Sequence, residues 1–161
     1  MNKKNENILK DMIRCNYSDS EIRLYFLIKY QTEITSQEYT VIKKRVGQED
    51  FRQNLITRYG YKCMITNSEI FEACHIEPYI ETNNMSVDNG LLLNSQHHKM
   101  FDSYIWSINP ETLEIEINDK KANPNDLFIL LIRDKSLDQL RLYSDTLIYI
   151  TKHYTKFKSY M

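Results

Sequence analysis

Residues 71–102 constrain the chain more than any other stretch, because they gather most of its chemistry-bearing side chains. Three of the four histidines lie here: His75, His97 and His98. An Asp-Asn-Gly sequence, typical of a turn, separates the first histidine from the other two. Residues 96–102 then have the composition of a short helix that ends in Phe-Asp. We expect the rest of the chain to support this segment.

The composition indicates one compact domain or two small ones, since 161 residues with 42% hydrophobic side chains can bury a real core. The net charge of −1 conceals a basic stretch between residues 43 and 62 and another near the C-terminus. Local patches, rather than the total charge, set the electrostatic field at a surface. A nucleic-acid-binding face is therefore compatible with this composition.

Cysteine usage and hydropathy bear on the compartment. The three cysteines are scattered and form no Cys-x-x-Cys pair, which argues against a zinc ribbon and favours a reducing environment. No apolar run approaches the roughly 20 residues that cross a membrane. The N-terminus lacks the apolar core of a signal peptide. We expect an intracellular protein that is neither secreted nor membrane-bound.

Residues 1–47 are predicted to form a helical segment. Ser18 or Asp19 can cap its second helix and Ser36 its third, and Gly47-Gln48 is the expected hinge to the remainder of the chain. Three short helices with a tight connection between the second and third have the outline of a helix-turn-helix module that reads DNA. A plain packing or dimerisation segment is the alternative.

Residues 48–161 are predicted to mix helices with short strands, which makes the fold class α+β. The Asn89-Gly90 pair is expected in a turn with positive φ. The expected elements are a helix at 49–59 capped by Gly60, strands at 61–66 and 71–76, a hairpin at 104–117, a strand or helix at 127–132, a strand at 140–143 and a last helix from residue 144.

Spacing brings the polar residues of the central segment into one pattern. A lone histidine at a strand end, such as His75, is usually structural. Here Asn89 follows 14 residues later and His98 another 9 residues on. Asp102 lies four residues beyond His98, so the two side chains share one face of a helix and can converge on one divalent ion. His97 points about 100° away and is expected to be at the surface or to face phosphate.

Several ordered motifs resemble those of the HNH endonuclease family. They are Phe51-Arg52, Tyr59-Gly60, Cys63-Met64-Ile65-Thr66, Glu72-Ala73-Cys74-His75-Ile76, Asn89-Gly90-Leu91-Leu92-Leu93 and His98-Lys99-Met100-Phe101-Asp102. The resemblance implies an HNH ββα-metal core, preceded by the helical segment and followed by a hairpin and a helix. It also implies a nuclease that leaves 5′-phosphate and 3′-hydroxyl ends.

The same resemblance assigns roles. His75 would be the base that activates water, Asn89 would hold it in position, and His98 with a carboxylate would bind one divalent metal ion. Oxygen ligands favour magnesium or manganese, whereas the imidazole makes zinc, nickel or cobalt feasible. Asp102 is the first carboxylate to consider.

The ligand on the strand side stays open, because Cys74 occupies a slot where many HNH enzymes have a metal-binding Asp or His. Cys74 is either a thiolate ligand, which would favour zinc, or a small core residue. Glu72, two residues earlier, is the third alternative. If Glu72 does not bind the metal, its structural role would be a hydrogen bond that anchors the neighbouring loop.

We therefore predict a divalent-metal-dependent DNA endonuclease of restriction or homing type. Cutting both strands would usually require a homodimer, because one HNH centre cuts one strand. The rival functions are a DNA-binding protein with an inactive centre and a zinc module that uses Cys63, Cys74 and histidines. Candidate phosphate contacts, each equally compatible with solvated surface, are Lys43, Lys44, Arg45, Arg52, Arg58 and Lys99.

Overall fold

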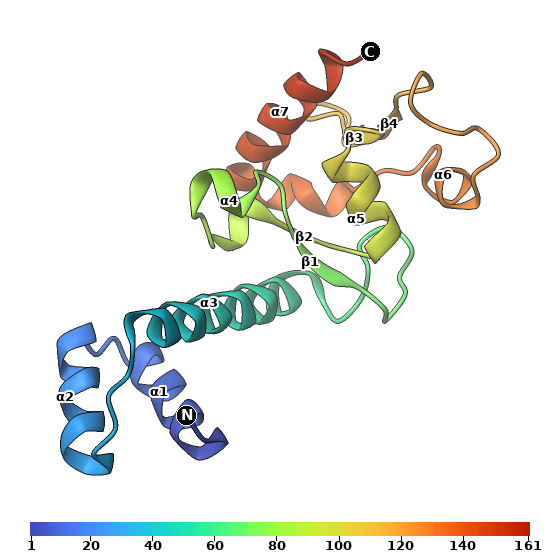
Figure 1. Ribbon diagram of the computed structural model, residues 1–161. Helices are drawn as coiled ribbons and strands as arrows, with labels where there is room; N and C mark the ends of the chain where they lie inside the picture. The colour runs from blue at the N-terminus through green and yellow to red at the C-terminus, as the bar shows by residue number, and fades with distance from the viewer. The chain divides into compact units, whose positions relative to one another are not determined.

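The computed structural model describes residues 1–161 and has an α+β fold. The chain divides into two compact units, Met1–Asp50 and Phe51–Met161. Seven α-helices and two small two-stranded sheets make up its regular structure, with two 3₁₀ helices between them (Figure 1). None of the helices combines the length and the apolar character that a membrane crossing requires.

The first unit consists of α1 (Lys3–Arg14), α2 (Asp19–Tyr30) and the beginning of α3 (Ser36–Tyr59). The predicted cap of the second helix is confirmed. The Ser18 hydroxyl accepts a hydrogen bond from the backbone N–H of Glu21, and the Glu21 carboxylate accepts one from the N–H of Ser18. The inward side chains form one apolar cluster: Leu9, Ile22, Phe26, Ile34, Ile42 and Val46.

α3 is one helix of 24 residues that continues from the first unit into the second. The helix is therefore continuous through Gly47-Gln48, where we expected a hinge. A glycine inside a helix costs only about 1 kcal/mol relative to alanine. Ion pairs from Lys10 and Arg14 of α1 to Glu49, at 2.9 and 2.8 Å, hold the helix just beyond the glycine. The predicted end is confirmed, since Gly60 follows α3 with a φ of +87°.

The second unit contains a ββα core. β1 (Glu72–His75) pairs antiparallel with β2 (Gly90–Leu93), and α5 (Ser95–Asp102) follows β2 directly. The register sets Glu72 opposite Leu93 and His75 opposite Gly90. Between the two strands lie α4 (Tyr79–Thr82) and the 3₁₀ helix η1 (Val87–Asn89).

The strand that we predicted over residues 61–66 does not form. This segment is a set of turns, in which the N–H of Met64 donates to Leu92 O at 2.8 Å. Its apolar residues Cys63, Met64 and Ile65 are buried all the same. The apolar run correctly indicated that these side chains are buried, but burial alone does not require the backbone to pair as a strand.

The C-terminal part wraps the ββα core. β3 (Trp106–Ile108) and β4 (Ile115–Ile117) form the predicted hairpin. The ambiguous segment is a helix, α6 (Leu127–Ile132), and the strand predicted over residues 140–143 is instead part of the 3₁₀ helix η2 (Asp138–Leu142). The last predicted helix is confirmed as α7 (Ser144–Lys158).

His153 fastens α7 to α5. Its ring stacks on Phe101 with centroids 3.6 Å apart and planes 4° from parallel. Its Nε2 donates to Phe101 O at 3.1 Å, so its Nδ1 accepts from the Ser107 hydroxyl at 2.8 Å. Burial lowers the pKa of His153 to about 4, and the ring is neutral in the folded protein. The helix that carries His98 and Asp102 is therefore held from behind by the end of the chain.

Candidate functional site

Three polar side chains form a continuous chain of contacts on one side of the ββα core. Glu72 comes from the start of β1, and His98 and Asp102 come from α5. His98 Nδ1 lies 2.9 Å from Glu72 Oε2, and His98 Nε2 lies 3.3 Å from Asp102 Oδ2. Both carboxylates are about half exposed. The imidazole thus sits between two acids that solvent can reach.

His75 ends β1 near this chain of contacts. Its ring stacks on Phe51 of α3, with centroids 4.2 Å apart and planes 3° from parallel. Its Nε2 is buried and has no hydrogen-bond partner in the protein. Most buried polar atoms have a hydrogen-bond partner, and the other buried side-chain atoms without one are Tyr59 Oη and His97 Nδ1. Burial first, and the nearby His98 second, lower the pKa of His75, which favours the neutral imidazole at physiological pH.

Gly90 makes the stacking of Phe51 on His75 sterically feasible. A Cβ at this position would lie 2.6 Å from Phe51 Cζ and 2.8 Å from the methyl groups of Leu55. The backbone φ of Gly90 is −143°, ordinary extended geometry. The prediction of a positive φ in the Asn89-Gly90 turn is therefore wrong: η1 ends at Asn89, and glycine is needed at residue 90 for space.

Asn89 holds the loop that follows His75. Its Oδ1 accepts from the N–H of Glu77 at 2.8 Å, and its Nδ2 donates to Glu77 O at 3.0 Å. In addition, the N–H of Ile76 donates to Asn89 O at 3.0 Å. The side chain is fully buried. Asn89 therefore fixes the backbone one and two residues beyond His75 from the far end of the loop.

The donors around His98 suit a divalent cation. No three His, Cys, Asp or Glu side chains surround a common point as a preformed metal cage. Two carboxylates and one imidazole are nevertheless the ligand types that such ions take. Burial raises the pKa of Asp102, His98 opposes this rise, and Glu72 adds to it. A cation near Asp102 and Glu72 would relieve their repulsion, so the residues fit a metal ion.

Cys74 lies in the apolar core of the second unit. The side chain is fully buried, and its Sγ contacts the carbonyl oxygen of Glu72 at 3.6 Å. Burial raises the pKa of the Cys74 thiol well above its ordinary value, so the thiol stays protonated. Burial therefore favours the alternative in which Cys74 is a small core residue over the one in which it is a thiolate ligand.

His97 is also placed differently from our prediction. It is fully buried rather than at the surface, because the α5 face that carries it packs inward. Its Nε2 lies 2.9 Å from Phe128 O, and Trp106 Nε1 donates to its carbonyl oxygen at 3.0 Å. His97 thus ties α5 to β3 and to α6, and cannot face phosphate.

Two of the candidate phosphate contacts are engaged inside the second unit. Arg52 donates to Phe71 O at 3.1 Å and lies 4.5 Å from the centre of the Phe71 ring. Arg58 pairs with Asp88 Oδ1 at 2.7 Å and lies 4.7 Å from the centre of the Tyr143 ring. Their guanidinium groups join elements within the second unit, and their role as phosphate contacts stays a prediction.

The other four candidates are exposed. Lys43, Lys44 and Arg45 lie on the outside of α3, where Arg45 is 3.5 Å from Glu6. Lys99 is exposed on α5, next to His98.

Sequence reasoning missed the part that Phe51 plays in the site. Phe51 was expected as half of a Phe-Arg motif, without any link to His75. The motif itself was the signal, since both of its members reach the central segment: Phe51 contacts His75, and Arg52 contacts Phe71.

Comparison with known families gives one result for this region. Residues 63–109 match the model of the HNH endonuclease family. This segment is similar to the HNH endonucleases. It spans β1, β2, α5 and β3 and contains Glu72, His75, Asn89, His98 and Asp102, whereas α1–α3 and the chain beyond residue 109 lie outside the match. A search of curated proteins found no match to the chain.

An HNH endonuclease domain indicates a nuclease that acts on DNA. The family match and the α+β architecture agree with what the sequence motifs implied. The separate roles of the site residues are not part of that match.

Proposed function

We propose that the chain is a divalent-metal-dependent DNA endonuclease that hydrolyses phosphodiester bonds at a one-metal centre. The observation that supports it best is that His75, with its unpaired nitrogen, lies close enough to His98 for His98 to lower its pKa, while His98 contacts Glu72 and Asp102. A base for water and a set of cation ligands beside each other are what this hydrolysis requires.

His75 acts as the general base. Its neutral ring can take a proton from a water molecule that attacks the scissile phosphorus, and burial keeps it neutral near pH 7. Phe51 fixes the plane of the ring by stacking. Asn89 fixes the backbone that follows His75, which makes it a positioning residue.

Asp102, His98 and Glu72 would hold the metal ion. When bound, a divalent cation neutralises charge on the scissile phosphate and stabilises the departing 3′ oxygen. The two carboxylates favour magnesium or manganese, and the imidazole allows zinc, nickel or cobalt. His98 would exchange one of its carboxylate contacts for the metal, and the other carboxylate would keep the ring oriented.

The first unit supplies sequence recognition in this proposal. Lys43, Lys44 and Arg45, which are exposed on α3, would contact phosphate, and α2 followed by α3 has the order of a helix-turn-helix. A restriction or homing enzyme, active as a homodimer that cuts both strands, is the function that we propose for the whole chain. Three free cysteines fit work inside a cell.

Nicking of supercoiled plasmid DNA in Mg²⁺ or Mn²⁺ tests the proposal. Wild type should nick, and His75→Ala should nick about 10²–10⁴ times more slowly. Gln96→Ala, an exposed change on α5, is the matched control and should nick at the wild-type rate. DNA binding of His75→Ala, measured by fluorescence anisotropy, should equal that of wild type.

Different outcomes would reject different parts of the proposal. If wild type binds DNA but nicks nothing with any of the five metals, the enzyme is rejected in favour of a DNA-binding protein with an inactive centre. If His75→Ala nicks at the wild-type rate, His75 is not the base. If Asp102→Asn leaves Mn²⁺ affinity unchanged in calorimetric titration, the ligand set is wrong.

A further inference from the structure

The outward face of α2 is apolar. Its exposed fractions are 56% for Leu24, 37% for Tyr25, 50% for Leu27 and 72% for Ile28. The opposite face buries Ile22 and Phe26, so the helix is apolar on both sides. Single exposed leucines are common, but a contiguous apolar patch of this kind marks an interaction site. We call Leu24, Tyr25, Leu27 and Ile28 the α2 apolar face.

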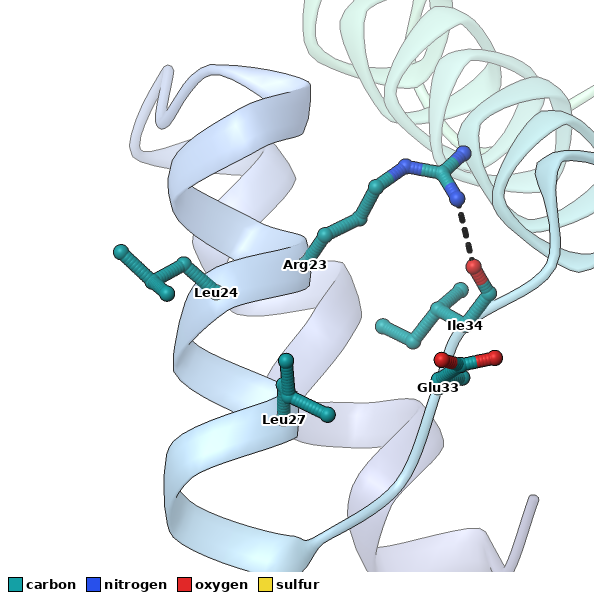
Figure 2. A pocket seen from close by; sticks show the side chains of 5 residues that line it. All are labelled: Arg23, Leu24, Leu27, Glu33 and Ile34. Atoms are coloured by element: carbon teal, nitrogen blue, oxygen red, sulfur yellow. Dashed lines mark hydrogen bonds between the residues drawn. The ribbon is translucent and has the colours of Figure 1, made fainter.

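Two grooves border the α2 apolar face. One, of about 430 Å³, lies between α2 and the segment before α3; Figure 2 shows Leu24 and Leu27 projecting from the helix, while Arg23 reaches across to donate to Ile34 O at 2.6 Å. The other, of about 420 Å³, lies on the far side of Leu24. It is lined by Met12, Tyr17, Glu21, Leu24, Tyr25, Ile28 and Lys29.

The chemistry of this face points to protein rather than DNA. The lining of the second groove is almost wholly apolar, with Glu21 and Lys29 as its only charged members. A nucleic-acid surface needs clustered cations to neutralise phosphates. Leucine and isoleucine side chains in a groove instead receive apolar side chains from another protein.

The two charges make the face complementary to itself. Glu21 lies near the N-terminal end of α2 and Lys29 near its C-terminal end, eight residues or about 12 Å apart. When two such helices pack antiparallel about a two-fold axis at Leu24 and Tyr25, each acid meets the base of the other copy. The apolar side chains then meet in the middle, as an isologous interface requires.

We propose that the α2 apolar face binds the same face of a second copy of this chain. In this dimer the helices run antiparallel, Ile28 of each copy enters the groove beside Tyr17 of the other, and two symmetric Glu21–Lys29 ion pairs close the ends. The pairing goes beyond the nuclease function, because it assigns the dimer contact to residues outside the matched nuclease segment.

The size of the face sets the expected strength. α2 has 12 residues and is therefore about 18 Å long, so one helix pair with its two grooves is at the small end of specific interfaces. We expect an equilibrium between monomer and dimer that depends on protein concentration.

Sedimentation equilibrium of the full chain tests the pairing. The mass should rise from 19.4 kDa towards twice that value as concentration increases. Ile28→Lys and Leu24→Lys should each weaken the dimer by about tenfold or more, because they put a cation in the apolar centre. Leu142→Lys, which changes a side chain that is 80% exposed in the second unit, is the matched control and should leave the dimer unchanged.

Mixing two charge variants makes the test specific for the antiparallel arrangement. Glu21→Lys and Lys29→Glu should each be monomeric alone, since like charges then meet at both ends. An equal mixture should form heterodimers, because each end regains opposite charges. Circular dichroism checks that both variants are folded, since Glu21 also accepts hydrogen bonds at the cap of α2.

Three results would overturn the pairing. The first is a mass of 19.4 kDa at every concentration up to about 200 µM. If Ile28→Lys also lost thermal stability in that case, the α2 apolar face would be covered by other residues of the same chain. An unchanged dimer in Ile28→Lys and Leu24→Lys would mean that another surface pairs. A mixture that stays monomeric would reject the antiparallel arrangement. If wild type forms the dimer but does not nick DNA, the nuclease function alone is rejected.

Discussion

Gly90→Ala offers the sharpest test of how the candidate base is positioned. The added Cβ would lie 2.6 Å from Phe51 Cζ, whereas carbon atoms in contact prefer about 3.5–4.0 Å. The Phe51 ring would have to move by roughly 0.9 Å or more. Because the ring stacks on His75, the displacement should be transmitted to the base.

Two effects follow from this displacement. Overpacking of a filled core costs about 1–3 kcal/mol, which corresponds to a fall in Tm of roughly 2–12 °C for a chain of this size. A misplacement of about 1 Å in a catalytic group can reduce the rate by about 10²-fold. We therefore expect Gly90→Ala to be folded, less stable and at least tenfold slower in plasmid nicking.

Urea unfolding and plasmid nicking measure the two effects separately. Gly60→Ala is the control: its Cβ meets nothing within 4 Å, but its φ of +87° is strained for alanine, so only stability should fall. Phe51→Leu removes the Cζ atom that clashes. The double variant Gly90→Ala/Phe51→Leu should therefore be more stable than the sum of the single changes predicts.

The reasoning would be refuted by either of two results. One is a Gly90→Ala protein with wild-type stability and nicking rate, which would mean that the neighbours yield without cost. The other is strict additivity of the Gly90 and Phe51 substitutions, which would place the effect of Gly90 elsewhere.

Three further predictions concern the surroundings of the site. Asn89→Ala should cost about 2–3 kcal/mol of stability in urea unfolding, because it leaves backbone groups of Glu77 unpaired. It should also slow nicking. Nicking at the wild-type rate would show that Asn89 is not a positioning residue. The pKa of His153 is about 4 in the folded protein and near 6.5 in the unfolded chain, so its contribution to stability should be complete above pH 6.5 and should fall by about 3 kcal/mol as the pH drops towards 4. A His153→Gln variant should lose this pH dependence of stability. If the pH dependence persists in the variant, it belongs to other groups. Arg58→Ala should cost about 1–3 kcal/mol of stability and leave the salt dependence of DNA binding unchanged. Lys99→Ala should keep stability and lower the slope of log affinity against log salt concentration by about 0.9 if Lys99 contacts one phosphate. The reverse pattern would make Arg58 a phosphate contact.

The sequence predicted those features that depend on local chemistry. The cap at Ser18 and the C-cap at Gly60 follow from backbone groups that neighbouring residues must satisfy, so a few consecutive residues were enough to predict both. The hairpin at Trp106–Ile117 likewise followed from alternation around a turn. The proximity of His98 and Asp102 followed from the helical period, and the structure places them 3.3 Å apart.

Features that depend on packing between distant segments could not be read in this way. A basic side chain gives the same sequence signal whether it faces solvent or, like Arg58, an acid 30 residues away. His97 and His98 are neighbours in the chain, and only the burial of α5 decides which of them faces inward. Gly90 was assigned to a turn because its steric reason, Phe51, lies 39 residues earlier in the sequence.

The contact of His153 with α5 has a consequence for synthesis. A ribosome releases the chain from its N-terminus, so the strands and α5 emerge well before residue 153. Until that histidine arrives, Phe101 lacks its stacking partner and Ser107 its hydrogen-bond acceptor. The nascent polypeptide can therefore expose every residue of the candidate centre while the helix bearing His98 is still unsupported. α5 therefore gains its full set of supporting contacts only after translation has passed residue 153.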